Sequence, residues 1–183
     1  MRAALALFIE HGADGASIEK IARRAGVAKT SIYRRWSSRE ALLAQAIELG
    51  RDAAGFSAEA VDRASPDELV QLLLDASTLM ARPELRKLSA RLIGSLPDSP
   101  RLVAVYRETY FRPRWEAFLR ALRRAQRAGL LPPEADPEIL AAMLSGALTH
   151  RLLAPPPGED SAEQWRAYMR ALLRQLGFRG ELA

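Results

Sequence analysis

Seven basic side chains lie between residues 20 and 39, and the same stretch contains no aspartate or glutamate. The seven are Lys20, Arg23, Arg24, Lys29, Arg34, Arg35 and Arg39. The whole chain carries a net charge of only +5, so the charge of this stretch is a local feature. Guanidinium and ammonium groups bind phosphate oxygens, and the segment is therefore typical of a nucleic-acid-binding surface. A solvated basic face without a ligand is the alternative interpretation.

Residues that most catalytic and metal centres need are scarce in this chain. It has no cysteine, which excludes disulfides, thiolate metal sites and cysteine nucleophiles. Its two histidines, His11 and His150, cannot make a three-histidine metal site. The sequence contains no Glu-x-x-His pair, Gly-x-Ser-x-Gly elbow or glycine-rich phosphate loop. We therefore expect no cofactor, no metal and no enzymatic activity.

The length of 183 residues suits one large helical domain, or a small domain joined to a medium one. No apolar run reaches the roughly 18 residues that a membrane span needs. The first residues also lack the basic region and apolar stretch of a signal peptide. These features predict a cytoplasmic protein without a membrane partner.

Helical periodicity dominates the chain, and no segment shows the sustained alternation of a strand. Helix starts are marked by capping serines, as in Ser65-Pro66-Asp67-Glu68 and Ser161-Ala162-Glu163-Gln164. Pro113 is expected to kink or split the long helix that contains it. Residues 55–65 are small and mixed, which indicates a linker or a weak helix end. The prediction is an all-α fold of about nine helices.

Residues 17–36 have the pattern of two helices joined by a tight turn. The first helix begins at Ser17, whose hydroxyl can accept a hydrogen bond from a free backbone N–H. It ends at Gly26, because the turn that follows needs a positive φ. Val27 and Ile32 are expected to fill the angle between the helices. This is the helix-turn-helix arrangement, in which the second helix lies in the major groove of DNA.

The residues from 17 to 42 also resemble a known signature. They read Ser17-Ile18-x-x-Ile21-Ala22-x-x-Ala25-Gly26-Val27-Ala28-Lys29-x-x-Ile32-Tyr33-Arg34-x-Trp36-x-Ser38-Arg39-Glu40-x-Leu42. This order is similar to the DNA-binding signature of tetracycline-repressor-like (TetR family) regulators. The family usually has threonine, glycine, histidine, phenylalanine and lysine where this chain has Ser17, Thr30, Arg35, Trp36 and Arg39. The threonine in place of glycine changes what the second helix presents to the bases.

The resemblance implies a set of DNA contacts. Ser17 and Arg39 would contact phosphates from helix starts, and Tyr33 would donate its hydroxyl to the DNA backbone. The remaining residues would face base edges or flanking phosphates, and helical spacing favours Arg34 over Arg35 for a base contact. The implied DNA-binding residues are Ser17, Lys29, Thr30, Ser31, Tyr33, Arg34 and Arg39.

The resemblance also implies two domains. Residues 1–50 would form a three-helix helix-turn-helix DNA-binding domain, and residues 51–183 a helical effector-binding and dimerisation domain. Family members usually carry basic residues ahead of the first helix, whereas this sequence begins almost at Leu5. Either the sequence starts late, or the phosphate contacts of such an arm are absent.

The helix expected over residues 137–153 is apolar nearly all round and must be covered on two sides. With the helix expected over residues 162–176 it can build a four-helix bundle across a two-fold axis. This agrees with the homodimer that the resemblance implies. The candidate interface residues are Leu140, Leu144, Leu148, Trp165, Met169 and Leu172.

A pocket for a small hydrophobic or aromatic effector is expected mainly from the resemblance, with plain core packing as the alternative. In the family the effector favours a conformation whose recognition helices no longer match the groove spacing. The candidate lining residues are Met80, Tyr106, Tyr110, Phe111, Trp115 and Met143.

Four arginines, at positions 120, 123, 124 and 127, recur at the spacing of one helix face. The simplest expectation for such a stripe is a solvated helix face, and a second nucleic-acid surface is the alternative.

The sequence as a whole predicts a homodimeric transcriptional regulator. We expect it to bind a palindromic site in double-stranded DNA, to act as a repressor and to be released by a small molecule. The alternative is a helical ligand-binding or interaction protein whose degenerate helix-turn-helix binds DNA weakly or not at all. A gel-shift assay separates these two possibilities.

Overall fold

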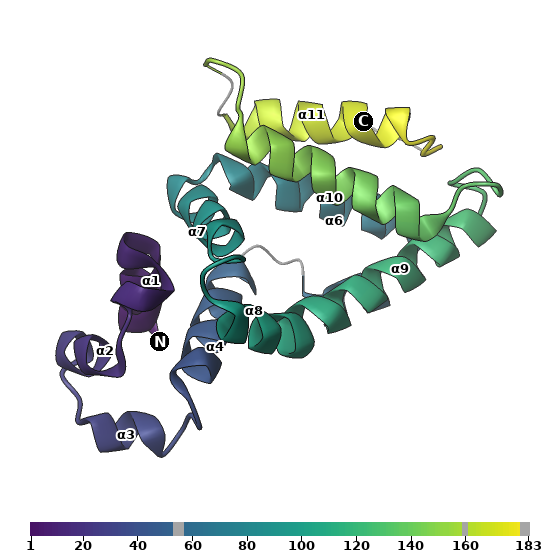
Figure 1. Ribbon diagram of the computed structural model, residues 1–183. Helices are drawn as coiled ribbons and strands as arrows, with labels where there is room; N and C mark the ends of the chain where they lie inside the picture. The colour runs from purple at the N-terminus through teal and green to yellow at the C-terminus, as the bar shows by residue number, and fades with distance from the viewer. Residues whose placement is uncertain (53–56, 159–160, 180–183) are drawn as a thin grey trace. The chain divides into compact units, whose positions relative to one another are not determined.

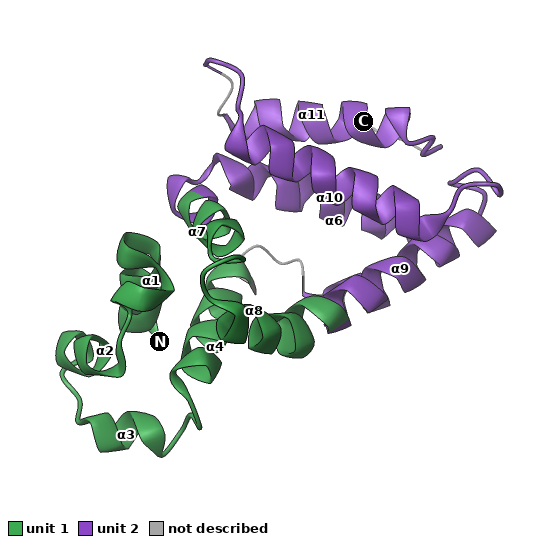
Figure 2. Ribbon diagram, in the orientation of Figure 1, with its two compact units in different colours: residues 1–53, 87–112 green, residues 54–86, 113–183 purple. Residues whose placement is uncertain are grey.

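The computed structural model describes residues 1–52, 57–158 and 161–179 (Figure 1). Within those ranges the secondary structure is helical and contains no strand, which confirms the predicted all-α class. The chain divides into two compact units, one of residues 1–53 and 87–112 and the other of residues 54–86 and 113–183 (Figure 2). The functional boundary predicted at residue 50 remains a prediction. No helix in the described ranges is both long and apolar enough to cross a membrane.

The first unit is built around two 14-residue helices, α1 and α4, that pack against each other. Phe8 of α1 and Leu43 and Ile47 of α4 are completely buried in its core. At Gly50 a Cβ atom would lie 2.9 Å from side-chain atoms of Leu5 and Leu88, so this glycine permits close packing. The elements are α1 (Arg2–Gly15), α2 (Ile18–Ala25), α3 (Lys29–Tyr33), α4 (Arg39–Asp52), most of α7 (Pro83–Gly94) and α8 (Pro100–Tyr106).

The second unit has one apolar core. Leu69 and Leu73 of α6, Leu122 of α9 and Met169 and Leu173 of α11 all belong to it and are almost inaccessible to solvent. Helix α11 packs against α6 (Figure 1), and α10 contributes Leu140 and Leu144 to the same core. The elements are α5 (Ala58–Arg63), α6 (Pro66–Thr78), the 3₁₀ turn η1 (Leu79–Ala81), α9 (Arg112–Arg127), α10 (Pro137–Leu153) and α11 (Ala162–Gln175).

The predicted capping signals are present in the structure. Ser65 and Ser161 each begin a helix with a reciprocal capping box, in which the serine hydroxyl accepts from the N3 backbone and the N3 side chain accepts from the serine N–H. The predicted interruption at Pro113 takes the form of a π-helical turn, η2 (Arg107–Phe111), between α8 and α9. A proline cannot donate to the carbonyl four residues earlier, so the widened turn precedes it.

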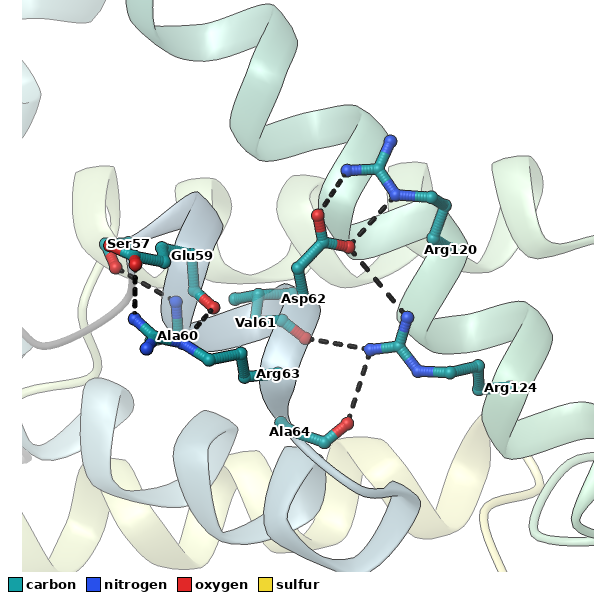
Figure 3. Close-up of polar contacts among 9 residues, drawn as sticks. All are labelled: Ser57, Glu59, Ala60, Val61, Asp62, Arg63, Ala64, Arg120 and Arg124. Carbon is teal, nitrogen blue, oxygen red and sulfur yellow. Dashed lines mark hydrogen bonds and ion pairs between the residues drawn. The ribbon is translucent and has the colours of Figure 1, made fainter.

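The segment predicted as a linker contains helix α5, and arginines of α9 hold it in place (Figure 3). Arg120 donates to both carboxylate oxygens of Asp62, over 2.9 and 2.6 Å. Arg124 donates to the backbone carbonyls of Val61 and Ala64 at the end of α5, over 3.0 and 3.2 Å. Arg120, Arg123 and Arg127 are exposed, as expected of a solvated helix face, and Arg124 is partly buried. Two arginines of this face also hold α5.

We predict that Asp62→Asn lowers thermal stability in a pH-dependent way. The hydrogen bond from Arg120 holds the pKa of Asp62 below its usual value. A carboxyl group with a lowered folded-state pKa stabilises the fold above its ordinary pKa, and this contribution is lost as the pH falls through the folded value. The unfolding midpoints of wild type and variant, measured by circular dichroism, should therefore differ at pH 7 and converge in acid.

Glu134→Gln is the matched control for Asp62→Asn, because Glu134 is exposed and has no ion-pair partner among the described residues. It should leave the midpoint unchanged at both pH values. A destabilisation by Asp62→Asn that stays the same from pH 7 to strongly acidic pH would contradict the assigned ion pair.

Candidate nucleic-acid interface

The turn between α2 and α3 has the predicted geometry. Gly26 adopts the left-handed conformation, with φ 66° and ψ 33°, and so ends α2. The N–H of Val27 donates to the carbonyl of Ala22 over 3.0 Å, which closes the helix end. Ala28 then has the extended backbone of an N-cap, and α3 begins at Lys29. Residues 17–36 therefore form a helix-turn-helix.

Helix α3, which the structure describes in full, buries one of its five side chains. Ile32 is 5% exposed and packs into the helix-turn-helix as predicted. Val27, which was expected to share that role, is 46% exposed, so this expectation was wrong. The turn directs Val27 away from the core, and the apolar contact between the helices rests on Ile32.

The other side chains of α3 and its end are presented to solvent. Tyr33 is 57% exposed, which excludes the possibility that it is part of the core. Thr30 and Arg34 are also exposed, and Ser31 is partly buried. Hydroxyl and guanidinium groups suited to phosphates and base edges therefore lie together on α3 and on Arg34, which directly follows it.

Lys29, the first residue of α3, forms an ion pair with Glu19 of α2. This contact lowers the pKa of Glu19, because the ammonium group hydrogen-bonds to the carboxylate. This pair was not predicted from the sequence. Ten residues separate the partners, and their proximity follows only from the angle of the helix-turn-helix.

Two further basic residues of the 20–39 segment form contacts within the first unit. Arg39 at the start of α4 donates to the carbonyl of Ala13 over 3.2 Å and pairs with Glu40. Arg24 makes a two-pronged ion pair with Glu10 of α1, over 2.5 and 2.7 Å. The phosphate contact implied for Arg39 remains a prediction. Among the described residues, no ion-pair partner is found for Lys20, Arg23, Arg34 and Arg35.

Ser17 is the N-cap of α2, and its hydroxyl accepts from the N–H of Lys20 over 3.3 Å. It is partly buried, so the capping role is present and the implied phosphate contact is untested. Trp36 lies just after α3, and its indole N–H donates to the amide oxygen of Gln45 on α4 over 2.6 Å. Trp36 is partly buried, and its hydrogen bond to Gln45 was not predicted from the sequence.

The six candidate dimer residues all belong to the second unit. Leu140, Leu144, Trp165 and Met169 are buried within the second unit, and Leu148 and Leu172 pack against its core. Leu140, Leu144, Trp165 and Met169 are therefore covered by their own chain, whereas Leu148 and Leu172 are partly exposed. The interface role of these residues remains a prediction. Helix α10 also exposes another face, on which lie Ile139, Met143, Gly146, His150 and Leu153.

The candidate pocket residues are divided between the two compact units. Tyr106, Tyr110 and Phe111 belong to the first unit, where the rings of Tyr106 and Tyr110 lie 6.0 Å apart at 37°. Met80, Trp115 and Met143 belong to the second. Trp115 packs against the core, whereas Met143 is 53% exposed and lies on the solvent face of α10. The effector pocket remains a prediction.

Comparison with known proteins identifies the family. The family described as "Bacterial regulatory proteins, tetR family" matches residues 1–46, and the family described as "Tetracyclin repressor-like, C-terminal domain" matches residues 63–165. This chain belongs to the TetR family of transcriptional regulators. It is 30% identical over 159 residues to the HTH-type transcriptional regulator YdeS of Bacillus subtilis, covering 84% of this chain and 76% of that protein.

Solved structures of TetR-family proteins share the fold. The SmeT–triclosan complex matches with a TM-score of 0.75 and 22% identity, over 99% of this chain and 90% of that one. A TetR-family regulator from Rhodococcus sp. matches with a TM-score of 0.73 and 21% identity, over 96% and 95% of the two chains. These similarities support the all-helical fold with an N-terminal helix-turn-helix and a C-terminal helical domain.

The pair between Glu19 and Lys29 generates a prediction for this DNA-binding family. Glu19→Gln should release Lys29 to bind a phosphate and remove a negative charge next to the DNA. Each additional phosphate contact steepens the slope of log K against log salt by about 0.9. We therefore expect tighter DNA binding and a slope that is steeper by about 1. Fluorescence anisotropy over a salt series measures both quantities.

Glu59→Gln is the control for Glu19→Gln, since it removes one carboxylate from an exposed ion pair, with Arg63, in the other unit. It should leave the salt slope unchanged. An identical slope for Glu19→Gln and wild type would mean that Lys29 contacts no phosphate even when it is released.

Proposed function

We propose that this chain forms a homodimer that binds a palindromic site in double-stranded DNA and represses transcription until a small molecule releases it. The observation that carries the proposal is the exposure of Thr30, Tyr33 and Arg34 on a helix anchored by Ile32 in a helix-turn-helix. Such a helix fits the major groove, where arginine can bind guanine through two hydrogen bonds.

Phosphate contacts would supply much of the affinity. Lys20, Arg23 and Arg35 are exposed and have no ion-pair partner in the described ranges, so they can bind phosphates without breaking an internal pair. Ser17 and Arg39 lie at the starts of α2 and α4, where free N–H groups favour an anion. Binding should therefore weaken steeply with salt.

The exposed apolar face of α10 supports a dimer. Ile139, Met143 and Leu153 are each more than half exposed, and residues 139, 143, 146, 150 and 153 recur at helical spacing. A stripe of this kind on one helix is suited to a self-complementary two-fold interface. Two-fold symmetry would present two α3 helices to successive major grooves of a palindrome.

An effector of small size is supported by related proteins. One solved structure with a similar fold is the SmeT–triclosan complex, and another is a transcriptional regulator from Saccharomonospora viridis in complex with choline. We propose that this chain, working in the cytoplasm, likewise binds a small hydrophobic or aromatic molecule.

The DNA-binding proposal predicts the effect of Arg34→Ala. Loss of a two-pronged arginine–guanine contact costs about 1–3 kcal/mol, so specific affinity should fall by roughly 5- to 150-fold. A binding site is first selected from a random DNA library with the wild-type protein, and affinities are then measured by anisotropy. Arg101→Ala, which removes an exposed arginine of α8, should leave sequence preference unchanged.

Two outcomes would contradict this assignment. If Arg34→Ala binds the selected site as tightly as wild type, Arg34 reads no base. If the wild-type protein selects no site and binds all DNA equally weakly, the chain is the helical ligand-binding or interaction protein with a degenerate helix-turn-helix.

The dimer proposal predicts that Met143→Asp gives monomers, because a charge would be buried at the centre of the apolar face of α10. Sedimentation velocity at micromolar concentration measures the change. Leu96→Asp is the matched control, since Leu96 is equally exposed but lies in the other unit. A dimer that persists in Met143→Asp and is lost in Leu96→Asp would place the interface elsewhere.

A further inference from the structure

Helix α1 is broken within the first unit. Gly12 has φ 72° and ψ −174°, which are not helical angles, and the chain resumes a helical path up to Gly15. Such a residue interrupts the ladder of backbone hydrogen bonds and leaves carbonyls of the preceding turn in need of donors. A side chain at position 12 would be strained by the positive φ, so the break is fixed in the sequence by glycine.

Arg91 of α7 supplies donors at this break. Its Nε donates to the carbonyl of Ile9 over 3.2 Å, and its Nη2 donates to the carbonyl of Glu10 over 3.4 Å. More than eighty residues of chain separate the partners. Hydrogen bonds from a charged donor are stronger than those between neutral groups, so the guanidinium is well suited to closing a helix end.

Glu10 contacts two arginines. Its backbone carbonyl accepts a hydrogen bond from Arg91, and its carboxylate binds Arg24 of α2. The carboxylate of Glu10 accepts two hydrogen bonds from Arg24, over 2.5 and 2.7 Å, and this contact lowers the pKa of Glu10. Arg24 lies in the last turn of α2, two residues before Gly26 and the turn into α3. A continuous series of hydrogen bonds therefore runs from α7 through the break in α1 to the helix-turn-helix.

We propose that Arg91 is a positioning residue for DNA binding, which fixes α2 and α3 through the break in α1 and the pair of Glu10 with Arg24. The proposal rests on the proposed DNA-binding function and adds a residue that lies outside the helix-turn-helix. Arg39 holds the other side of the same break through the carbonyl of Ala13. The break is thus the point at which α2, α4 and α7 are joined by arginine side chains.

Lys87 provides a matched control. It lies one helical turn before Arg91 on α7, lines the same surface groove of about 680 Å³, and is exposed. No hydrogen bond or ion pair of its side chain is described. Lys87→Ala and Arg91→Ala therefore change the charge of this groove equally, while only Arg91→Ala opens the break in α1.

The first measurement is the affinity for a DNA site selected by the wild-type protein and for the same site with one base pair inserted at its centre. Arg91→Ala should bind the selected site about tenfold more weakly, as expected for the loss of charged hydrogen bonds. Its preference for the selected spacing over the altered spacing should shrink, and its salt slope should stay that of wild type. Lys87→Ala should keep both the affinity and the spacing preference.

The second measurement is amide hydrogen exchange without DNA, followed by mass spectrometry. Arg91→Ala should exchange faster than wild type in residues 9–26 and equally fast in α10 and α11, whereas Lys87→Ala should match wild type throughout. If exchange in residues 9–26 is unchanged, or if Arg91→Ala flattens the salt slope and loses affinity equally at both spacings, the positioning role is wrong. Failure of the wild type to select any site would overturn the proposed function, while the exchange result still decides whether Arg91 holds α2.

Discussion

The surface proposed to read DNA depends on the burial of Ile32. Helix α3 has only five residues, too few to be a stable helix on its own, and Ile32 is the side chain that fixes it against α2. Burying a single apolar side chain leaves the remaining α3 positions free to carry hydroxyl and guanidinium groups. The left-handed conformation of Gly26 sets the angle between α2 and α3 at which Ile32 packs. The hydrogen bond from Trp36 to Gln45 fixes the chain just after α3.

The same unit restrains its own positive charge. Three glutamates form ion pairs with basic residues of the 20–39 segment. The pairs are Glu19 with Lys29, Glu10 with Arg24 and Glu40 with Arg39, so part of the segment's positive charge is neutralised in the free protein. Exposed ion pairs contribute only about 0–1 kcal/mol to stability, so Glu19→Gln can release Lys29 without unfolding the helix-turn-helix. The pair of Glu10 with Arg24 is more constrained, because it has two hydrogen bonds and joins α1 to α2. The basic residues therefore fall into two groups. Some are available to bind DNA, and others, such as Arg24, hold the helices of the helix-turn-helix unit together.

Much of this architecture could be predicted from local sequence. Serine caps, Pro113 and Gly26 act on backbone neighbours, so the helix boundaries and the turn between α2 and α3 followed from the residues themselves. The face of α10 could not be predicted in the same way. That helix is apolar nearly all round, and periodicity cannot choose which side its own chain covers, so Leu140 and Leu144 were assigned to an interface although they are buried. The partners of Lys29, Arg91 and Arg120 lie 10, 82 and 58 residues away, and such pairs follow only from tertiary structure.

The central claim is that two copies of α3 enter successive major grooves on one side of a DNA duplex. Hydroxyl-radical footprinting of the wild-type protein on a selected binding site tests this directly. The account predicts two protected patches on the same face of the duplex, centred about 10 base pairs or a multiple of that apart. A single protected patch, or protection spread evenly along the fragment, would contradict it.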